Sequence, residues 1–315
     1  MTYSRTYLVT GGAGFIGSNY LNKFVTLKPD TFFVNIDCLT PAGSLDNITV
    51  SSAPNYLFSQ VDIRNIEALT EIFTEFKPTH IIHFAAESHV DRSLENPNIF
   101  IETNITGTHN LLALAHKNGN SRYHQVSTDE VYGALSALDP EFTEDSPIRP
   151  NNPYSASKAS ADHFVRAYHQ TFGLPTTISR CSNNYGPRQD KTKVIPLFIT
   201  KLLAGEKVPL YGEGAQIRDW LFVEDHIDAI QLILEKGRLG EIYNIGGGVE
   251  ISNLDLTKKL LTATGRGETF IEQVADRLGH DFRYAIDSSK IEKELGWKAK
   301  KSFADGLAET VAFYR

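Results

Sequence analysis

Short apolar runs alternate with amphipathic segments over the first 180 residues or so of the chain. The apolar runs have the length and composition of buried strands, and the segments between them repeat hydrophobic positions at helical spacing. This alternation predicts an α/β fold with a Rossmann-type doubly wound parallel sheet, covered by helices on both faces. The predicted strands are residues 7–10, 31–36, 56–61, 80–84, 123–127 and 176–181, and the predicted helices are residues 16–27, 65–76, 98–117 and 154–172.

The pattern changes after residue 181. Residues 182–219 are rich in Gly, Pro and charged residues and show little regular periodicity. We therefore expect a Rossmann domain of residues 1–182 plus about 220–245, and a smaller mixed α/β C-terminal substrate domain of residues 183–219 plus about 246–315. The later predicted elements are a strand at 241–245 and helices at 222–236, 252–264, 288–295 and 303–314.

The composition is that of an ordinary globular protein. Of the 315 residues, 41% are hydrophobic and 22% are charged, and the formal net charge is -7 without a basic block, so we expect neither nucleic acid nor an anionic membrane as a partner. Cys38 and Cys181 lie in apolar stretches, where buried free thiols are the expectation, and point weakly to a reducing compartment. No apolar run reaches transmembrane length and the first strand leaves no room for a signal peptide, so a cytoplasmic location is expected.

A glycine-rich turn follows the first strand. Its spacing, Gly-x-x-Gly-x-x-Gly from Gly11 to Gly17, allows a sharp turn and brings backbone amides close to a pyrophosphate at the start of a helix. Asp37 ends the second strand 20 residues later, where a carboxylate can bind a ribose 2′-hydroxyl. A 2′-phosphate would be repelled there, and residues 37–44 contain no Arg or Lys, so the pattern favours NAD over NADP. Asp62 and Ile63, at the end of the third strand, suit the adenine edge.

Two motifs carry candidate catalytic groups. Tyr154 and Lys158 lie one helical turn apart, and the phenol can take a proton from an alcohol if Lys158 and a nicotinamide cation lower its pKa. Thr128 can orient the same hydroxyl. Asp129 and Glu130 would supply the acid and the base needed to remove water. Because neighbouring residues on a strand point to opposite faces, both carboxyls can reach one substrate only if the strand ends there and the chain turns.

These motifs resemble those of the extended short-chain dehydrogenase/reductases that act on nucleotide sugars, and most closely the dTDP-glucose 4,6-dehydratase family. The resemblance spans nearly the whole chain, and the Thr-Asp-Glu triplet distinguishes this family from related 4-epimerases and decarboxylases. The motifs that carry it are residues 11–17, 83–93, 128–130, 154–158, 183–187, 218–220 and 276–281.

The resemblance implies a hydro-lyase that converts dTDP-glucose to dTDP-4-keto-6-deoxyglucose, a precursor of deoxysugars such as rhamnose. Tyr154 and NAD would oxidise carbon 4, Glu130 would remove the proton on carbon 5, Asp129 would protonate the hydroxyl leaving carbon 6, and the hydride would return to carbon 6. The implied cofactor-binding residues are Gly11, Gly14, Phe15, Ile16, Gly17, Asp37, Asp62, Ile63, Ala85, Ala86, Tyr154 and Lys158. The implied substrate-binding residues are Ser88, Asn183, Lys193, Val194, Pro209, Tyr211, Arg218, Asn253, Arg277 and Tyr284.

Alternatives remain at this stage. Residues 190–194 and Leu278 depart from the family pattern where the base or diphosphate should bind, so a UDP-glucose 4,6-dehydratase stays open. A nucleotide-sugar 4-epimerase would not need Asp129 and Glu130, and a non-catalytic dinucleotide-binding regulator would not need Tyr154 and Lys158. The ten histidines show no metal-ligand spacing, so no metal is expected. The resemblance also implies a homodimer, with helices 98–117 and 154–172 packed as a four-helix bundle.

Overall fold

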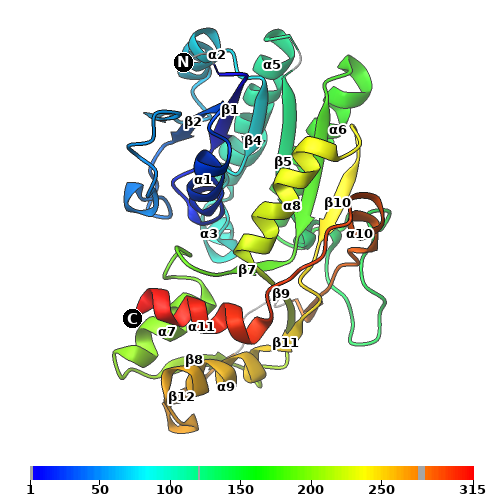
Figure 1. The fold of residues 1–315 in the computed structure, drawn as a ribbon. Helices are drawn as coiled ribbons and strands as arrows, with labels where there is room; N and C mark the ends of the chain where they lie inside the picture. Colours follow the sequence, from blue (N-terminus) through cyan, green and yellow to red (C-terminus); the bar gives the residue numbers. More distant parts are fainter. Residues whose placement is uncertain (1–2, 120, 276–280) are drawn as a thin grey trace.

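A computed structural model describes residues 3–119, 121–275 and 281–315 of the chain. Its main element is a seven-stranded parallel sheet in the order β10-β6-β5-β4-β1-β2-β3 (Figure 1). The order in which the chain adds strands to the sheet reverses between β1 and β4. At such a position doubly wound folds bind ligands, at the carboxyl ends of the strands. The strands are β1 (Arg5–Thr10), β2 (Thr31–Asp37), β3 (Tyr56–Gln60), β4 (His80–His83), β5 (Arg122–Thr128), β6 (Thr176–Cys181) and β10 (Ile242–Ile245).

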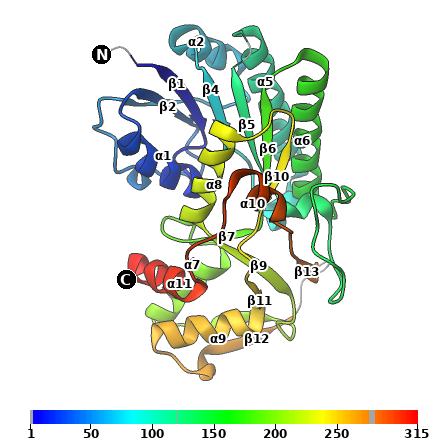
Figure 2. The same cartoon turned by 45° about the vertical axis from the view of Figure 1, so that its right-hand side comes forward.

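Helices cover both faces of this sheet, as the alternating pattern predicts (Figures 1 and 2). One hydrophobic core lies under α1 (Phe15–Leu27), α8 (Val223–Lys236) and α10 (Ser289–Leu295). A second core, on the other face, lies under α2 (Ile66–Phe76), α5 (Thr108–Lys117) and α6 (Pro153–Phe172). The Rossmann-type fold is therefore confirmed.

The predicted helix at 98–117 is not uniform. It consists of α4 (Pro97–Phe100), a π-helical segment η2 (Ile101–Gly107) and then α5, and a short helix α3 (Val90–Glu95) precedes it. Within η2, Asn104 donates to the Glu87 carbonyl at 3.0 Å and to the Ser157 hydroxyl at 2.8 Å. A π turn carries one extra residue, and such turns are common where a helix serves a functional site.

The remaining elements form a second region, which Figure 1 shows below the large sheet. Residues 182–219 show little regular periodicity, yet the stretch contains two strands, a helix and the start of a third strand. One sheet has the order β11-β9-β13 with β7 on β9, and β8 pairs with β12. The elements are β7 (Asn183–Tyr185), α7 (Val194–Leu203), β8 (Val208–Tyr211), β9 (Ile217–Phe222), β11 (Glu250–Ser252), α9 (Asn253–Thr264), the short 3₁₀ turn η4 (Glu268–Phe270), β12 (Ile271–Val274), β13 (Arg283–Tyr284) and α11 (Phe303–Tyr314). Two further 3₁₀ turns, η1 (Leu45–Asn47) and η3 (Asp129–Tyr132), belong to the first region.

This second region has a hydrophobic core of its own, formed mainly by α7, α9, α11 and β9. After β9 the chain returns to the large sheet through α8 and β10. The exact domain boundaries stay a prediction. No helix in the described part of the chain is long and apolar enough to cross a membrane.

Candidate active site

A cavity of about 340 Å³ opens at the carboxyl ends of the central strands. It receives residues from the turns after β1 to β5, from α6 and from the segment after β6. All the predicted cofactor-binding and catalytic residues line it, together with three of the predicted substrate residues. The lining residues predicted from the sequence are Gly11, Gly14, Phe15, Ile16, Gly17, Asp37, Asp62, Ile63, Ala85, Ala86, Ser88, Thr128, Asp129, Glu130, Tyr154, Lys158, Asn183 and Lys193.

The glycine turn fits a dinucleotide because side chains cannot be accommodated there. Gly11 has a φ of +69°, and a Cβ on it would lie 2.5 Å from the amide nitrogen of Ala85. A Cβ on Gly17 would lie 2.4 Å from the Gly11 carbonyl oxygen, so its absence lets α1 pack tightly against the turn. Gly14 caps α1 and has no side chain to accept from the first-turn amides. These amides, at a helix N-terminus beside the cavity, form a site for phosphate.

Asp37 lies at the end of β2 and is held in place by backbone amides. Its carboxylate accepts from Ala13 N at 3.0 Å and from Leu39 N at 2.8 Å. Burial raises the pKa of Asp37, and the two amide hydrogen bonds counteract that rise. The carboxylate is therefore fixed in the cavity wall at the position expected for a ribose-binding acid.

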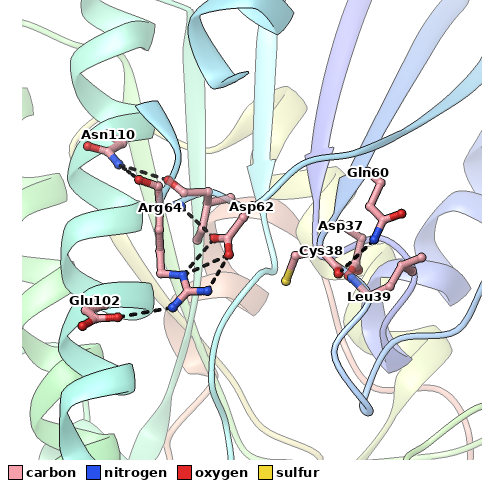
Figure 3. Close-up of polar contacts among 9 residues, drawn as sticks. Asp37, Cys38, Leu39, Gln60, Asp62, Arg64, Glu102 and Asn110 are labelled. Atoms are coloured by element: carbon pink, nitrogen blue, oxygen red, sulfur yellow. Dashed lines mark hydrogen bonds and ion pairs between the residues drawn. The ribbon is translucent and has the colours of Figure 1, made fainter. Parts of the chain in front are cut away.

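A cation that sequence reasoning missed lies beside Asp62. Arg64 lines the cavity, and its guanidinium makes a two-pronged contact with the Asp62 carboxylate, with Nη2 2.6 Å from Oδ2 (Figure 3). The hydrogen bonds and charge of Arg64 lower the pKa of Asp62. Arg64 also lies 3.2 Å from Glu102 of η2. A partner for a 2′-phosphate was expected only within residues 37–44, whereas Arg64 lies in the turn after β3. Both nearby carboxylates offset its charge.

The expectation of two buried thiols holds only for Cys181. Cys38 is exposed and lines the cavity, because β2 ends at Asp37 and the side chain that follows lies beyond the strand (Figure 3). The apolar stretch before it does not extend to this position. Within the described residues, no group of three or more His, Cys, Asp or Glu side chains could hold a metal ion.

Tyr154 and Lys158 project from the first two turns of α6. Pro153 begins the helix, and the cap residue Asn152 accepts from Ser155 N at 2.9 Å. Lys158 donates from Nζ to the Val126 carbonyl of β5 at 2.7 Å, which anchors its ammonium at the sheet edge. Burial lowers the pKa of Lys158.

The environment of the Tyr154 phenol differs from the expected one. Burial, followed by the Glu130 carboxylate, raises the pKa of Tyr154, and the Thr128 hydroxyl lowers it. The protein groups taken together thus shift this pKa opposite to the direction that a base needs. Lowering it requires a further positive charge beside the phenol.

Asp129 and Glu130 both line the cavity because β5 ends just before them. Thr128 caps η3, and its hydroxyl accepts from Glu130 N and lies 3.3 Å from Asp129 Oδ1. The required turn at this position is therefore present. Asp129 is 2% exposed, and its Oδ2 has no hydrogen-bond partner among the described residues.

The two carboxyls have different electrostatic surroundings. Burial raises the pKa of Asp129 well above its ordinary value, and the carboxylates of Glu130 and Asp219 raise it further. Burial also raises the pKa of Glu130, but Arg218 and Lys193 lower it. Neighbouring carboxyls with environments that separate their pKa values are typical of an acid–base pair.

The predicted substrate residues divide into three groups. Lys193 lines the cavity and donates to the Ser88 carbonyl at 3.1 Å. Arg218 lies with its guanidinium 4.5 Å from the centre of the Tyr284 ring, close enough to Glu130 to lower that residue's pKa. The residues that do not line the cavity are Val194 at the start of α7, Pro209 and Tyr211 in β8, Arg218 in β9, Asn253 at the start of α9 and Tyr284 in β13, and Arg277 lies outside the described residues.

Comparison with known proteins agrees with this geometry. A family model for GDP-mannose 4,6 dehydratase matches residues 8–310. The dTDP-glucose 4,6-dehydratase of Neisseria gonorrhoeae is 46% identical over 98% of this chain and 95% of that protein. The crystal structure of DesIV, a dTDP-glucose 4,6-dehydratase of Streptomyces venezuelae with NAD and TYD bound, has a TM-score of 0.94 at 48% identity and covers 98% of this chain and 96% of that one.

The chain belongs to the GDP-mannose 4,6 dehydratase family. The fold alone does not separate the activities found on it. The UDP-glucose 4-epimerase of Thermotoga maritima has a TM-score of 0.90 at 32% identity and covers 98% of both chains. A choice between these activities therefore has to rest on the residues of the site.

Several lining residues were not predicted from the sequence. They come mostly from the turn after β7 and from the edges of already recognised motifs. Asn184 follows the predicted Asn183 directly, so the motif itself was a signal for it. Gln189 and Asp190 lie in a stretch without periodicity, whereas Phe84 and Thr103 lie in a predicted strand and helix whose pattern does not show which side chains face a cavity. The missed lining residues include Cys38, Arg64, Phe84, Thr103, Asn184, Gln189 and Asp190.

Proposed function

We propose that this protein converts dTDP-glucose to dTDP-4-keto-6-deoxyglucose with loss of water, as a hydro-lyase that uses NAD. The observation that carries the proposal is that Asp129, with its raised pKa, and Glu130 line the same cavity as Tyr154 and Lys158. Simple oxidation or epimerisation of a sugar needs only Tyr154 and Lys158. The similarity to two dTDP-glucose 4,6-dehydratases supports the choice of reaction.

The cavity wall offers a complete dinucleotide site. The α1 N-terminus and the turn from Gly11 to Gly17 would hold the pyrophosphate, Asp37 would bind the adenosine ribose, and Asp62 and Ile63 would border the adenine. Ala85 and Ala86 would border the middle of the cofactor, with Tyr154 and Lys158 at its nicotinamide end. When bound, NAD takes a hydride from the sugar and later returns it.

Tyr154 and Lys158 serve the oxidation at carbon 4. Tyr154 takes the proton of the 4-hydroxyl, and Thr128, which lies beside the phenol, orients that hydroxyl. The Tyr154 pKa is raised in the protein, so the phenol needs the positive charge of the cofactor ring and of Lys158 to act as a base. Lys158 is held ready for this by its bond to Val126.

Asp129 and Glu130 serve the removal of water. A ketone at carbon 4 acidifies the proton on carbon 5, and Glu130 takes that proton because Arg218 and Lys193 favour its charged form. Asp129 stays protonated in its buried position and gives its proton to the hydroxyl that leaves carbon 6. Glu130 returns its proton to carbon 5 once carbon 6 has been reduced. Tyr154 then holds the proton of the 4-hydroxyl and Asp129 lacks the proton that it gave to the departing water, so a proton transfer from Tyr154 to Asp129 through solvent restores the starting state.

The nucleotide end extends from the cavity towards the second region. We assign sugar and diphosphate contacts to Ser88, Asn183, Lys193, Arg218 and Tyr284, because the first three line the cavity and the last two lie close to Glu130. Arginine suits a diphosphate because its fork meets two oxygens at once. Contacts to the base from Val194, Pro209, Tyr211, Asn253 and Arg277 remain predictions from the family pattern.

A UDP-glucose 4,6-dehydratase is the second candidate. The observation that favours it is that the unusual residues 190–194 lie against the cavity: Thr192 Oγ1 is 2.9 Å from His89 Nε2, and Lys193 contacts Ser88. A change in this segment can alter the choice of base. We also keep as proposals a cytoplasmic location, a homodimer, and a product used for rhamnose or another deoxysugar.

Mass spectrometry of the purified protein tests this function. The protein is incubated separately with dTDP-glucose and with UDP-glucose, first without and then with added NAD. Loss of one water from dTDP-glucose alone supports the proposal, and loss without added NAD shows that the cofactor is retained. Loss from UDP-glucose alone favours the second candidate. If neither sugar loses water even with NAD, the dehydratase proposal is wrong for these substrates.

A further inference from the structure

A buried ion pair lies next to the cavity without lining it. Arg180 of β6 donates from Nε to Asp162 Oδ2 of α6 at 2.9 Å, and the two side chains are only 4% and 2% exposed. Burying two charges costs several kcal/mol of desolvation each, and apolar residues of similar size often do as well. Stability alone therefore gives no reason for this pair.

Arg180 has a second contact on another element. Its guanidinium lies 4.8 Å from the centre of the Tyr132 ring, the geometry of a cation–π contact. Tyr132 is the last residue of η3 and is fully enclosed: its hydroxyl donates to Asn244 Oδ1 at 2.8 Å and its ring stacks on Phe142. The guanidinium thus joins α6 to η3.

These two elements carry the two halves of the proposed chemistry. Asp162 lies one helical turn beyond Lys158 and two turns beyond Tyr154, on the same side of α6. Tyr132 belongs to the same short turn as Asp129 and Glu130. The Asp162 carboxylate also raises the pKa of Lys158 and so offsets part of the effect of burial. A shift of Arg180 would therefore displace both Tyr154 and Lys158 on α6 and the two acids on η3.

We propose that Arg180 is a positioning residue that holds the oxidation pair on α6 and the elimination pair on η3 in register, through Asp162 on one side and Tyr132 on the other. This inference rests on the proposed function, in which both pairs act on one sugar, Tyr154 at carbon 4 and the acids at carbons 5 and 6. A displacement of about 1 Å in such an arrangement can cost on the order of 10²-fold in rate.

The main test is the double variant Arg180→Met/Asp162→Asn. It removes both charges at nearly constant volume, so that no unpaired charge stays buried. We expect a folded protein that binds NADH with unchanged affinity and has a KM within about threefold of wild type, but a kcat lower by roughly 10- to 100-fold. Reduced nicotinamide should build up during turnover, because α6 keeps the Lys158–Val126 hydrogen bond whereas η3 loses its contact with Arg180, so that the elimination slows more than the oxidation. Lys301→Met/Glu309→Gln removes a distant ion pair of 3.0 Å as the control.

A second measurement does not depend on substrate. Hydrogen–deuterium exchange of the double variant should be faster than in wild type in peptides covering both η3 and the start of α6, and unchanged there in the control.

The Tyr132 variants test the other side of the contact. Tyr132→Leu should reproduce the kinetic effect, whereas Tyr132→Phe, which keeps the ring under the guanidinium, should retain most of the wild-type activity.

The outcomes separate the two proposals. If wild type does not dehydrate dTDP-glucose, the proposed function fails, and exchange in the two segments still decides whether Arg180 joins them. Unchanged exchange in these segments overturns the positioning role. A kcat within about threefold of wild type, or a lower kcat without build-up of reduced nicotinamide, also overturns it.

Discussion

Asp129 and Glu130 are neighbours in the sequence, yet both line one cavity, because β5 ends at Thr128 and η3 begins with the acids. On a continuing strand they would point to opposite faces of the sheet. The turn also gives them different surroundings. Burial raises the pKa of both carboxyls; two neighbouring carboxylates raise that of Asp129 further, whereas Arg218 and Lys193 counteract the rise for Glu130. This difference suits the acid and base roles proposed for them.

The Asp129→Asn variant should separate the two halves of the reaction. An amide cannot give up a proton to the leaving hydroxyl, so water loss should slow by roughly 10²- to 10⁴-fold while the sugar is still oxidised. Absorbance of reduced nicotinamide follows the oxidation, and mass spectrometry follows the loss of water. The exposed Asp145→Asn, on the loop after η3, is the control. Loss of both steps in Asp129→Asn would mean that the residue is structural.

The same variant should stabilise the fold at neutral pH. Because the pKa of Asp129 is raised in the folded protein, the unfolded chain gives up this proton more readily, and the free energy of unfolding falls as the pH rises above the ordinary value of 3.8. The fall ends above the folded pKa. At about pH 8 we expect the free energy of unfolding of Asp129→Asn to exceed that of wild type by about 0.5–2 kcal/mol, with a higher unfolding temperature. Near pH 4 the two proteins should be equally stable. Thermal unfolding across this range tests the prediction, and a pH-independent difference would contradict it.

Strong local patterns were sufficient to predict the first domain. The glycine turn, the acids at the strand ends and Tyr154 with Lys158 all lie in or beside elements whose hydrophobic periodicity is long and clear. The turn at Asp129 could also be foreseen, since the proposed chemistry requires it. These residues come together because parallel strands end at one edge of the sheet.

In the second region the sequence predicted the helices α9 and α11, which match the expected 252–264 and 303–314, but not α7 or the strands. Its strands are three or four residues long in β7, β8 and β11, and β8 pairs with β12, more than 50 residues away, so no local window contains the signal. In α7 the apolar run is nearly continuous and contains Pro196 in its first turn, where proline is tolerated in a helix but hides the pattern. Arg64 was missed for a different reason, because a basic residue was expected only in residues 37–44, whereas Arg64 lies beside Asp62 in the turn after β3.

The Tyr154→Phe variant should block the reaction before any water is lost. It removes the one hydroxyl that can accept the proton of the sugar's 4-hydroxyl, so neither reduced nicotinamide nor product should form at more than a small fraction of the wild-type rate, a loss of about 10²-fold or more. Tyr168→Phe, about one turn from the C-terminus of the same helix, is the matched control. Wild-type turnover by Tyr154→Phe would remove Tyr154 from the mechanism.

Asp37→Asn should weaken the binding of NADH while keeping the shape of the side chain. A hydrogen bond to a charged group is worth about 1.5–3 kcal/mol, so the dissociation constant should rise by roughly 10- to 100-fold. The difference between the dissociation constants for NADH and NADPH should become smaller, because the variant no longer repels a 2′-phosphate. Fluorescence titration of the protein freed of cofactor measures both constants, with the exposed Asp46→Asn as the control. Unchanged NADH affinity would place the adenosine ribose elsewhere.

An aromatic face on α5 and α6 suits the proposed homodimer. Phe164 and Phe172 are 40% and 49% exposed, and His109 and His116 pack against them at 5.8 and 5.0 Å between ring centres. Large aromatic side chains left open on neighbouring helices favour association with a second copy. We expect light scattering to give about twice the chain mass of 35.1 kDa for wild type and the single mass for Phe164→Glu. Phe313→Glu changes an equally exposed ring on α11 and should stay dimeric. A Phe164→Glu protein that stays dimeric would exclude this face as the interface.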